Sequence, residues 1–111
     1  MQQKLESFFQ KDLTDKLKTI FPGCEIYKLD SKYTQGIPDW IILYGPQWAT
    51  FETKRTEHAP HQPNQDYYVL KMNNMSFSRF VYPQNVKQFL NELFNFFEGG
   101  NRDALESAQR L

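Results

Sequence analysis

Hydrophobic positions in the first part of the chain follow first a helical and then an extended pattern. Between residues 4 and 20 the apolar side chains recur on one stripe at helical spacing, and Pro22-Gly23 come directly after. This spacing predicts an amphipathic helix that ends before the proline. Residues 24–29 are predicted to form a short strand, and the polar segment 30–36 is predicted to be a loop.

Two segments rich in aromatic and β-branched residues follow, 38–44 and 48–54, separated by Gly45-Pro46. Dense β-forming residues on both sides of a turn sequence predict an antiparallel hairpin. Both faces of this hairpin carry large side chains. We therefore expect it in the middle of a sheet rather than at an edge.

The rest of the chain continues the alternation of helices and strands. A polar loop leads to a predicted helix at 65–73 and a predicted strand at 76–82, and Pro83 opens a second clear amphipathic helix. Gly99-Gly100 are expected to end that helix. The order α-β-β-β-α-β-α predicts an α/β fold with a small mixed sheet flanked by helices.

The composition fits one domain and excludes several classes of protein. The 111 residues, of which 40% are hydrophobic and 10 are Phe, are enough for one aromatic-rich core. We assign the domain to residues 1–98 and a polar tail with weak helical character to 99–111. The single Cys24 excludes an internal disulfide and a Cys-based zinc cluster. Without an apolar run of about 20 residues or a signal-peptide region, we expect a cytoplasmic protein that does not cross a membrane.

Two carboxylates are predicted to share one face of the hairpin. Alternation places Glu52 and Lys54 on the same face, and pairing Asp39 with Glu52 would bring their Cβ atoms to about 5 Å. Carboxylates this close repel each other unless a proton or a cation lies between them. Mg²⁺ would take oxygen ligands from both, with the backbone carbonyl of Thr53 as a third. Lys54 could then hold or activate a water molecule; the alternative is a strand with ordinary solvated charges.

The residues around this pair define its position more closely. Gly36 allows unusual backbone angles and Pro38 fixes the approach, so Asp39 enters its strand in a defined direction. Gln65 opens the helix after the polar loop and could face the site from above the sheet. For Gln65 alone, an ordinary polar residue at a helix N-terminus is the alternative.

Glu6 has an unusual position on the first predicted helix. On a helical wheel it falls within about 20° of Leu13 and Leu17, in the middle of the apolar stripe. A carboxylate on a buried face needs a partner, and a metal ion would supply one. The alternative is that Glu6 lies in the first turn and reaches solvent past the edge of the core.

Taken in order, these residues resemble the PD-(D/E)XK nuclease superfamily, and within it the virus-type replication-repair nuclease branch (VRR-NUC). The similar segments are Gly36-Ile37-Pro38-Asp39 and Phe51-Glu52-Thr53-Lys54, with Glu6 before them and Gln65 after. The resemblance runs from about Glu6 to the helix at 84–97. It implies a restriction-endonuclease-like core and Mg²⁺- or Mn²⁺-dependent hydrolysis of DNA phosphodiester bonds, as an endonuclease. Some relatives cut branched DNA, which makes junctions a candidate substrate.

The resemblance also implies a role for each matched residue. The carboxylates would bind the metal, Glu6 directly or through water, and Lys54 would position the attacking water and stabilise charge on the phosphate. Gln65 would support the site or the scissile phosphate. Gln62 competes for this family position, and Gln65 is favoured because apolar residues continue the helix after it. The implied catalytic set is Glu6, Asp39, Glu52, Lys54 and Gln65.

Partners are predicted from basic, aromatic and apolar surface residues. A nucleic-acid groove could be lined by Lys28, Lys32, Tyr33, Arg55, His58, His61 and Lys71. Tyr33 and Trp48 could stack on bases; for each residue alone, a solvated position is the alternative. Small stand-alone chains of this kind are similar to phage-encoded members, which often act as dimers. The Phe-rich helix at 84–97 is the expected homodimer contact.

The charge balance limits how DNA would be bound. With 13 Lys+Arg and 13 Asp+Glu the net charge is zero, which argues against binding DNA simply by being basic. If three carboxylates hold cations, the rest of the chain has an excess of three positive charges and the bound metal attracts phosphate. We therefore expect weak DNA binding without metal. The competing hypothesis is a catalytically silent DNA- or protein-binding regulatory module on the same scaffold.

Overall fold

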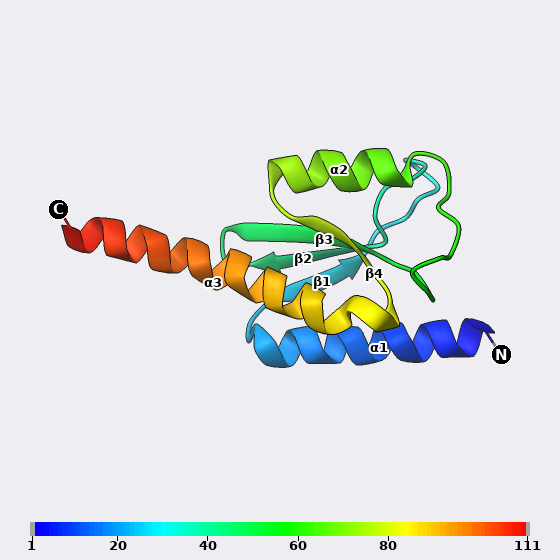
Figure 1. Ribbon diagram of the computed structural model, residues 1–111, viewed down its shortest axis with the longest axis horizontal. Helices are drawn as coiled ribbons and strands as arrows, with labels where there is room; N and C mark the ends of the chain where they lie inside the picture. The colour runs from blue at the N-terminus through cyan, green and yellow to red at the C-terminus, as the bar shows by residue number, and fades with distance from the viewer. Residues whose placement is uncertain (1, 111) are drawn as a thin grey trace.

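The computed structural model describes the backbone of residues 2–110 and the side chains of residues 7–99. Within this part of the chain, three helices and a four-stranded mixed sheet form an α/β fold (Figure 1). The elements are α1 (Gln2–Ile20), β1 (Glu25–Lys28), β2 (Trp40–Tyr44), β3 (Gln47–Thr53), α2 (Gln65–Met75), β4 (Ser78–Val81), the 3₁₀ turn η1 (Pro83–Asn85) and α3 (Val86–Arg110). The predicted order of helices and strands is confirmed.

The strands lie in the order β1-β2-β3-β4. The pairs β1/β2 and β2/β3 are antiparallel, and β3/β4 is parallel, because α2 crosses over the sheet between these two strands. The β2–β3 hairpin is therefore in the middle of the sheet, as predicted. Figure 1 shows α2 on one face of the sheet and both α1 and α3 on the other.

The hydrophobic core lies between the sheet and the pair α1/α3. Aromatic rings connect its layers: Phe51 of β3 lies 5.4 Å from Phe89 of α3, and Phe21 after α1 lies 5.2 Å from Phe97. The buried hydrophobic residues are Leu13, Leu17, Phe21, Ile42, Ala49, Phe51, Phe77, Val81, Phe89, Leu93 and Phe97. The expected aromatic-rich core is confirmed, and much of the Phe-rich face of α3 packs inside the chain rather than facing solvent.

The last helix is longer than predicted. Gly99-Gly100 were expected to end it, but α3 continues to Arg110, so this prediction is wrong. Gly99 does not adopt the positive φ that a glycine helix cap requires. The cost of a helical glycine, about 1 kcal/mol relative to alanine, does not by itself end a helix. None of the helices in the described part of the chain is long and apolar enough to cross a membrane.

Candidate active site

Asp39 and Glu52 face each other at the end of the central hairpin. Trp40 pairs with Phe51, so Asp39 and Glu52 lie opposite one another one position further along. The Asp39 carbonyl also accepts a hydrogen bond from the Leu29 amide at 2.6 Å, which holds this end of β2 against the segment after β1. The predicted hairpin register is confirmed. It places both carboxylates on the face of the sheet that α2 covers.

Glu52 is in an environment that disfavours its negative charge. Glu52 is only 4% exposed to solvent. Burial, followed by the charge of Asp39 and a side-chain hydrogen bond with it, raises the pKa of Glu52 to about 8, and Lys54 offsets part of this rise. Oε1 of Glu52 is buried and has no hydrogen-bond partner among the described residues. A buried oxygen of this kind requires a proton or a cation.

Asp39 is held by two hydrogen bonds from Thr53. Oδ2 of Asp39 accepts one from the Thr53 amide at 3.3 Å and one from the Thr53 hydroxyl at 2.9 Å. The same hydroxyl accepts a hydrogen bond of 2.8 Å from Nε2 of Gln10, which comes from α1. Helix α1 is thereby connected to Asp39 through one side chain. Neither Gln10 nor the Thr53 hydroxyl was predicted from the sequence to belong to the site. The sequence feature that could have pointed to Gln10 is its position one helical turn after Glu6.

Glu6 lies in α1, one turn before Gln10. Its side chain is outside the described residues, so its predicted place in the metal shell stays a prediction. Among the described residues, no three His, Cys, Asp or Glu side chains come together as a metal site. The described oxygen ligands for a cation are those of Asp39 and Glu52, with the predicted Thr53 carbonyl as a further one.

Lys54 is held next to this pair by the start of α2. Its Nζ donates a hydrogen bond of 2.6 Å to Oε1 of Gln65 and one of 3.1 Å to the Pro60 carbonyl. Oε1 of Gln65 also accepts a hydrogen bond of 2.8 Å from the Gln62 amide. Gln65 is buried, whereas Gln62 is exposed and contributes only its backbone. Of the two glutamines, Gln65 contacts the lysine.

A close backbone contact positions Asp39 under the start of α2. Gly36 has φ +92°, and a Cβ atom at this position would lie 2.6 Å from the carbonyl carbon of Asn64. Asn64, at the N-terminus of α2, has φ 72°, a left-handed conformation that Asn tolerates. Only glycine allows the loop before Pro38 to approach the loop before Gln65 this closely.

The predicted nucleic-acid-binding residues lie on different sides of the molecule. Lys28 pairs with Trp40, and its Nζ lies over the Trp40 ring and 3.5 Å from Oε1 of Gln10, on the face that α1 and α3 cover. Gln10 also connects to Asp39 through Thr53, and the expected contact of Lys28 with DNA stays a prediction. Lys71 lies over Tyr67 on α2, at the opposite face. The remaining members are on loops, namely Lys32, Tyr33, Arg55, His58 and His61.

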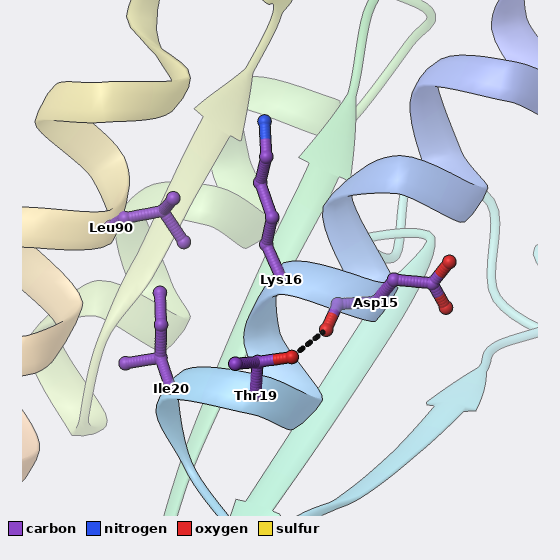
Figure 2. Close-up of a pocket in the computed structure, with 5 residues that line it drawn as sticks. All are labelled: Asp15, Lys16, Thr19, Ile20 and Leu90. Atoms are coloured by element: carbon purple, nitrogen blue, oxygen red, sulfur yellow. Dashed lines mark hydrogen bonds between the residues drawn. The ribbon is translucent and has the colours of Figure 1, made fainter.

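Several hollows lie away from the carboxylates. A mainly apolar groove of about 550 Å³ runs along the α2 face, and its lining includes Ile41, Leu43, Trp48 and Met72. A second hollow lies between α1 and α3; Figure 2 shows Ile20 beside Leu90 there, with the Asp15 carboxylate pointing away from both. None of these hollows includes the carboxylates of Asp39 and Glu52. The Asp39–Glu52 pair with Lys54 is the candidate active site because Glu52 is buried, its Oε1 has no hydrogen-bond partner among the described residues, and Lys54 is held in place by Gln65.

Comparison with known proteins adds no relative to this description. No family model, curated protein or solved structure matches the chain.

Proposed function

We propose that this chain is a divalent-metal-dependent deoxyribonuclease of the PD-(D/E)XK superfamily, with a restriction-endonuclease-like fold related to the VRR-NUC branch. It hydrolyses phosphodiester bonds in DNA as an endonuclease, and branched or junction DNA is its candidate substrate. Mg²⁺ is the proposed cofactor, and Mn²⁺ is expected to replace it.

The observation that carries this proposal is the carboxylate pair, in which Glu52 is buried and Asp39 is half-buried. Asp39 and Glu52 face each other on adjacent strands, and Oε1 of Glu52 has no hydrogen-bond partner within the described part of the chain. Their oxygens suit a hard divalent cation. The donor set is therefore chemically appropriate for Mg²⁺ or Mn²⁺, and Asp39, Glu52, the Thr53 carbonyl and Glu6 would hold it.

The remaining side chains fit the needs of phosphodiester hydrolysis. A bound divalent cation would neutralise charge on the scissile phosphate and lower the pKa of a bound water. Lys54 carries a positive charge beside the carboxylates, where it can orient the attacking water and stabilise charge on the phosphate. Gln65 holds Nζ of Lys54 in place at 2.6 Å. Thr53 fixes one oxygen of Asp39.

The test is cleavage of linear, circular, single-stranded and branched DNA with Mg²⁺ or Mn²⁺. We expect at least one substrate to be cut, and chelator or Asp39→Asn to abolish cutting. Asp12→Asn is the matched control, because Asp12 is exposed on α1 and pairs only with Lys16 at 2.9 Å. Cutting by Asp39→Asn at the wild-type rate, or no cutting of any substrate, contradicts the proposal.

The apolar groove beside α2 favours a second candidate function, a catalytically silent DNA- or protein-binding module. Its lining includes Leu43 and Trp48, and Leu43 is partly exposed. Such a module would bind its partner equally well in chelator, would cut no DNA, and would lose binding in Trp48→Ala. The proposed nuclease, by contrast, should bind DNA more weakly in chelator and should cut DNA when Mg²⁺ is present.

A homodimer stays a prediction from the resemblance. The structure buries Phe89, Leu93 and Phe97 inside the chain and leaves Phe94, at 42% exposure, on the surface. Light scattering after gel filtration, on wild type and Phe94→Ser, measures the oligomeric state. A monomeric wild type at micromolar concentration contradicts the prediction.

A further inference from the structure

His61 is fixed in the exposed loop between β3 and α2. Its Nδ1 lies 2.7 Å from Oδ1 of Asp66, and its ring stacks on Phe80 with centroids 4.1 Å apart and planes 20° from parallel. The backbone on either side is also held, since the Pro60 carbonyl accepts from Lys54 and the Gln62 amide donates to Gln65. A ring held in this way has lost most of its rotational freedom before any ligand arrives.

The stacking partner places His61 beside the carboxylate site. Phe80 of β4 is paired with Glu52 of β3, and neighbouring strands lie about 4.8 Å apart. The Phe80 side chain is on the α2 face, because Ser78, two residues earlier, accepts a hydrogen bond of 2.8 Å from the Thr50 hydroxyl on that face. His61 therefore borders the same face of the sheet as Glu52 and Lys54.

The contact with Asp66 determines which nitrogen of His61 can meet a ligand. Nδ1 is occupied, so Nε2 is the nitrogen left for an incoming group. The imidazolium form has a donor on each nitrogen, so that Nδ1–H faces Asp66 and Nε2–H is left for the ligand. A cationic N–H donor held next to a phosphodiesterase site is suited to a phosphate oxygen.

We propose that His61, oriented by Asp66 and Phe80, binds a phosphate of the substrate through Nε2, next to the bond that is cut. This inference rests on the proposed nuclease function and adds to it one specific contact with the DNA backbone. The proposed contact is made by His61 and not by His58, the other histidine of the loop. His58 has an 88% exposed side chain and only its neighbour Glu57 at 3.2 Å, whereas the side chain of His61 is 32% exposed.

Two variants form a matched pair: His61→Gln, and Lys18→Gln, which removes one exposed positive charge from the last turn of α1. The first measurement is fluorescence anisotropy of a labelled DNA substrate in chelator. Low salt strengthens the weak binding expected without metal, so that it can be measured and depends on phosphate contacts alone. We expect His61→Gln to bind about five- to tenfold more weakly than wild type. The slope of log K against log salt should also decrease by about one, the signature of one lost phosphate contact. Lys18→Gln should change neither quantity.

Asp66→Asn separates an orienting role from a surface charge. Removing an exposed negative charge near bound DNA strengthens binding when that charge only repels phosphate. We expect weaker binding, because Asp66 acts through His61. Tighter binding by Asp66→Asn, or equal binding by His61→Gln and Lys18→Gln, overturns the inference.

Cleavage measured on the same proteins distinguishes failure of this inference from failure of the proposed function. If wild type cuts DNA and His61→Gln has the same KM, only the phosphate contact is wrong. If wild type binds DNA but cuts none, the nuclease proposal fails and the anisotropy series still decides the role of His61. If wild type neither binds nor cuts, both proposals fail.

Discussion

The hydroxyl of Thr53 donates a hydrogen bond of 2.9 Å to the carboxylate of Asp39. Because the same hydroxyl accepts a hydrogen bond from Gln10 of α1, it joins the first helix to a proposed metal ligand. Outer hydrogen bonds of this kind orient metal-binding carboxylates, and their loss typically costs 10- to 100-fold in metal affinity or activity.

Removing this hydroxyl should therefore weaken metal binding without unfolding the protein. Thr53→Val keeps the shape of the side chain, and we expect about tenfold lower affinity for Mn²⁺ by isothermal titration calorimetry. Thr53→Ser, which retains the hydroxyl, is the control and should remain close to wild type. Equal Mn²⁺ affinity in all three proteins would show that the hydroxyl does not position Asp39 for a cation.

The stability of the metal-free protein should decrease between about pH 4.5 and pH 8. Burial and the nearby Asp39 charge raise the pKa of Glu52 from 4.5 to about 8, so in this range the folded chain keeps a proton that the unfolded chain releases. The free energy of unfolding then falls as pH rises, and each pKa unit corresponds to about 1.4 kcal/mol. Urea unfolding in chelator at several pH values measures this fall, which we expect to be a few kcal/mol.

Two comparisons connect this pH dependence to Glu52 and to metal. Glu52→Gln should flatten the curve, whereas Glu25→Gln, which removes an exposed carboxyl from β1, should leave it unchanged. At pH 8, Mg²⁺ should restore stability to wild type but not to Glu52→Gln, because a cation takes the place of the proton and binds the folded state. A flat curve for the wild type would contradict the electrostatic description of the site.

Local patterns were sufficient to predict the arrangement of the central hairpin. The β-forming segments around Gly45-Pro46 determined the strands, and strict alternation then placed Asp39 opposite Glu52 once the register was assumed. Both strands bury large side chains on the core face, so a shift by one residue would move the whole set to the wrong face. Because such a shift would expose these side chains to water, the assumed register is strongly favoured over its neighbours.

Features that depend on packing between distant elements could not be predicted. In the sequence, Gln10 is not distinguishable from other polar helical residues. Its hydrogen bond with Thr53 forms because α1 packs close to the end of β3. The position of Lys28 over the Trp40 ring likewise follows from the pairing of β1 with β2, which the isolated strand does not reveal. The difference between His58 and His61 depends on Phe80 and Asp66, which come from other elements.

Gln65, rather than Gln62, should control the position of Lys54, the proposed catalytic lysine. Gln65→Ala removes the acceptor 2.6 Å from Nζ of Lys54, and a misplaced lysine should lower kcat by about 10- to 100-fold with a small change in KM. Gln62→Ala keeps the backbone amide that contacts Gln65 and should retain nearly full activity. A larger loss in Gln62→Ala than in Gln65→Ala, from steady-state DNA cleavage, would assign this proposed role to Gln62 instead.

Two glycines with positive φ allow the close loop contact at the site to be tested separately from backbone strain. Gly36→Ala and Gly23→Ala both force alanine into a left-handed conformation, at a cost of about 1–2 kcal/mol. A Cβ at Gly36 would also collide with Asn64, whereas a Cβ at Gly23 has no atom within 4 Å. We therefore expect Gly36→Ala to lose about 2–4 kcal/mol of unfolding free energy and to bind Mn²⁺ more weakly, because Asp39 moves away from Glu52. Gly23→Ala should keep wild-type Mn²⁺ affinity. If urea unfolding and calorimetry give the same values for both variants, the contact between Gly36 and Asn64 does not position the carboxylates.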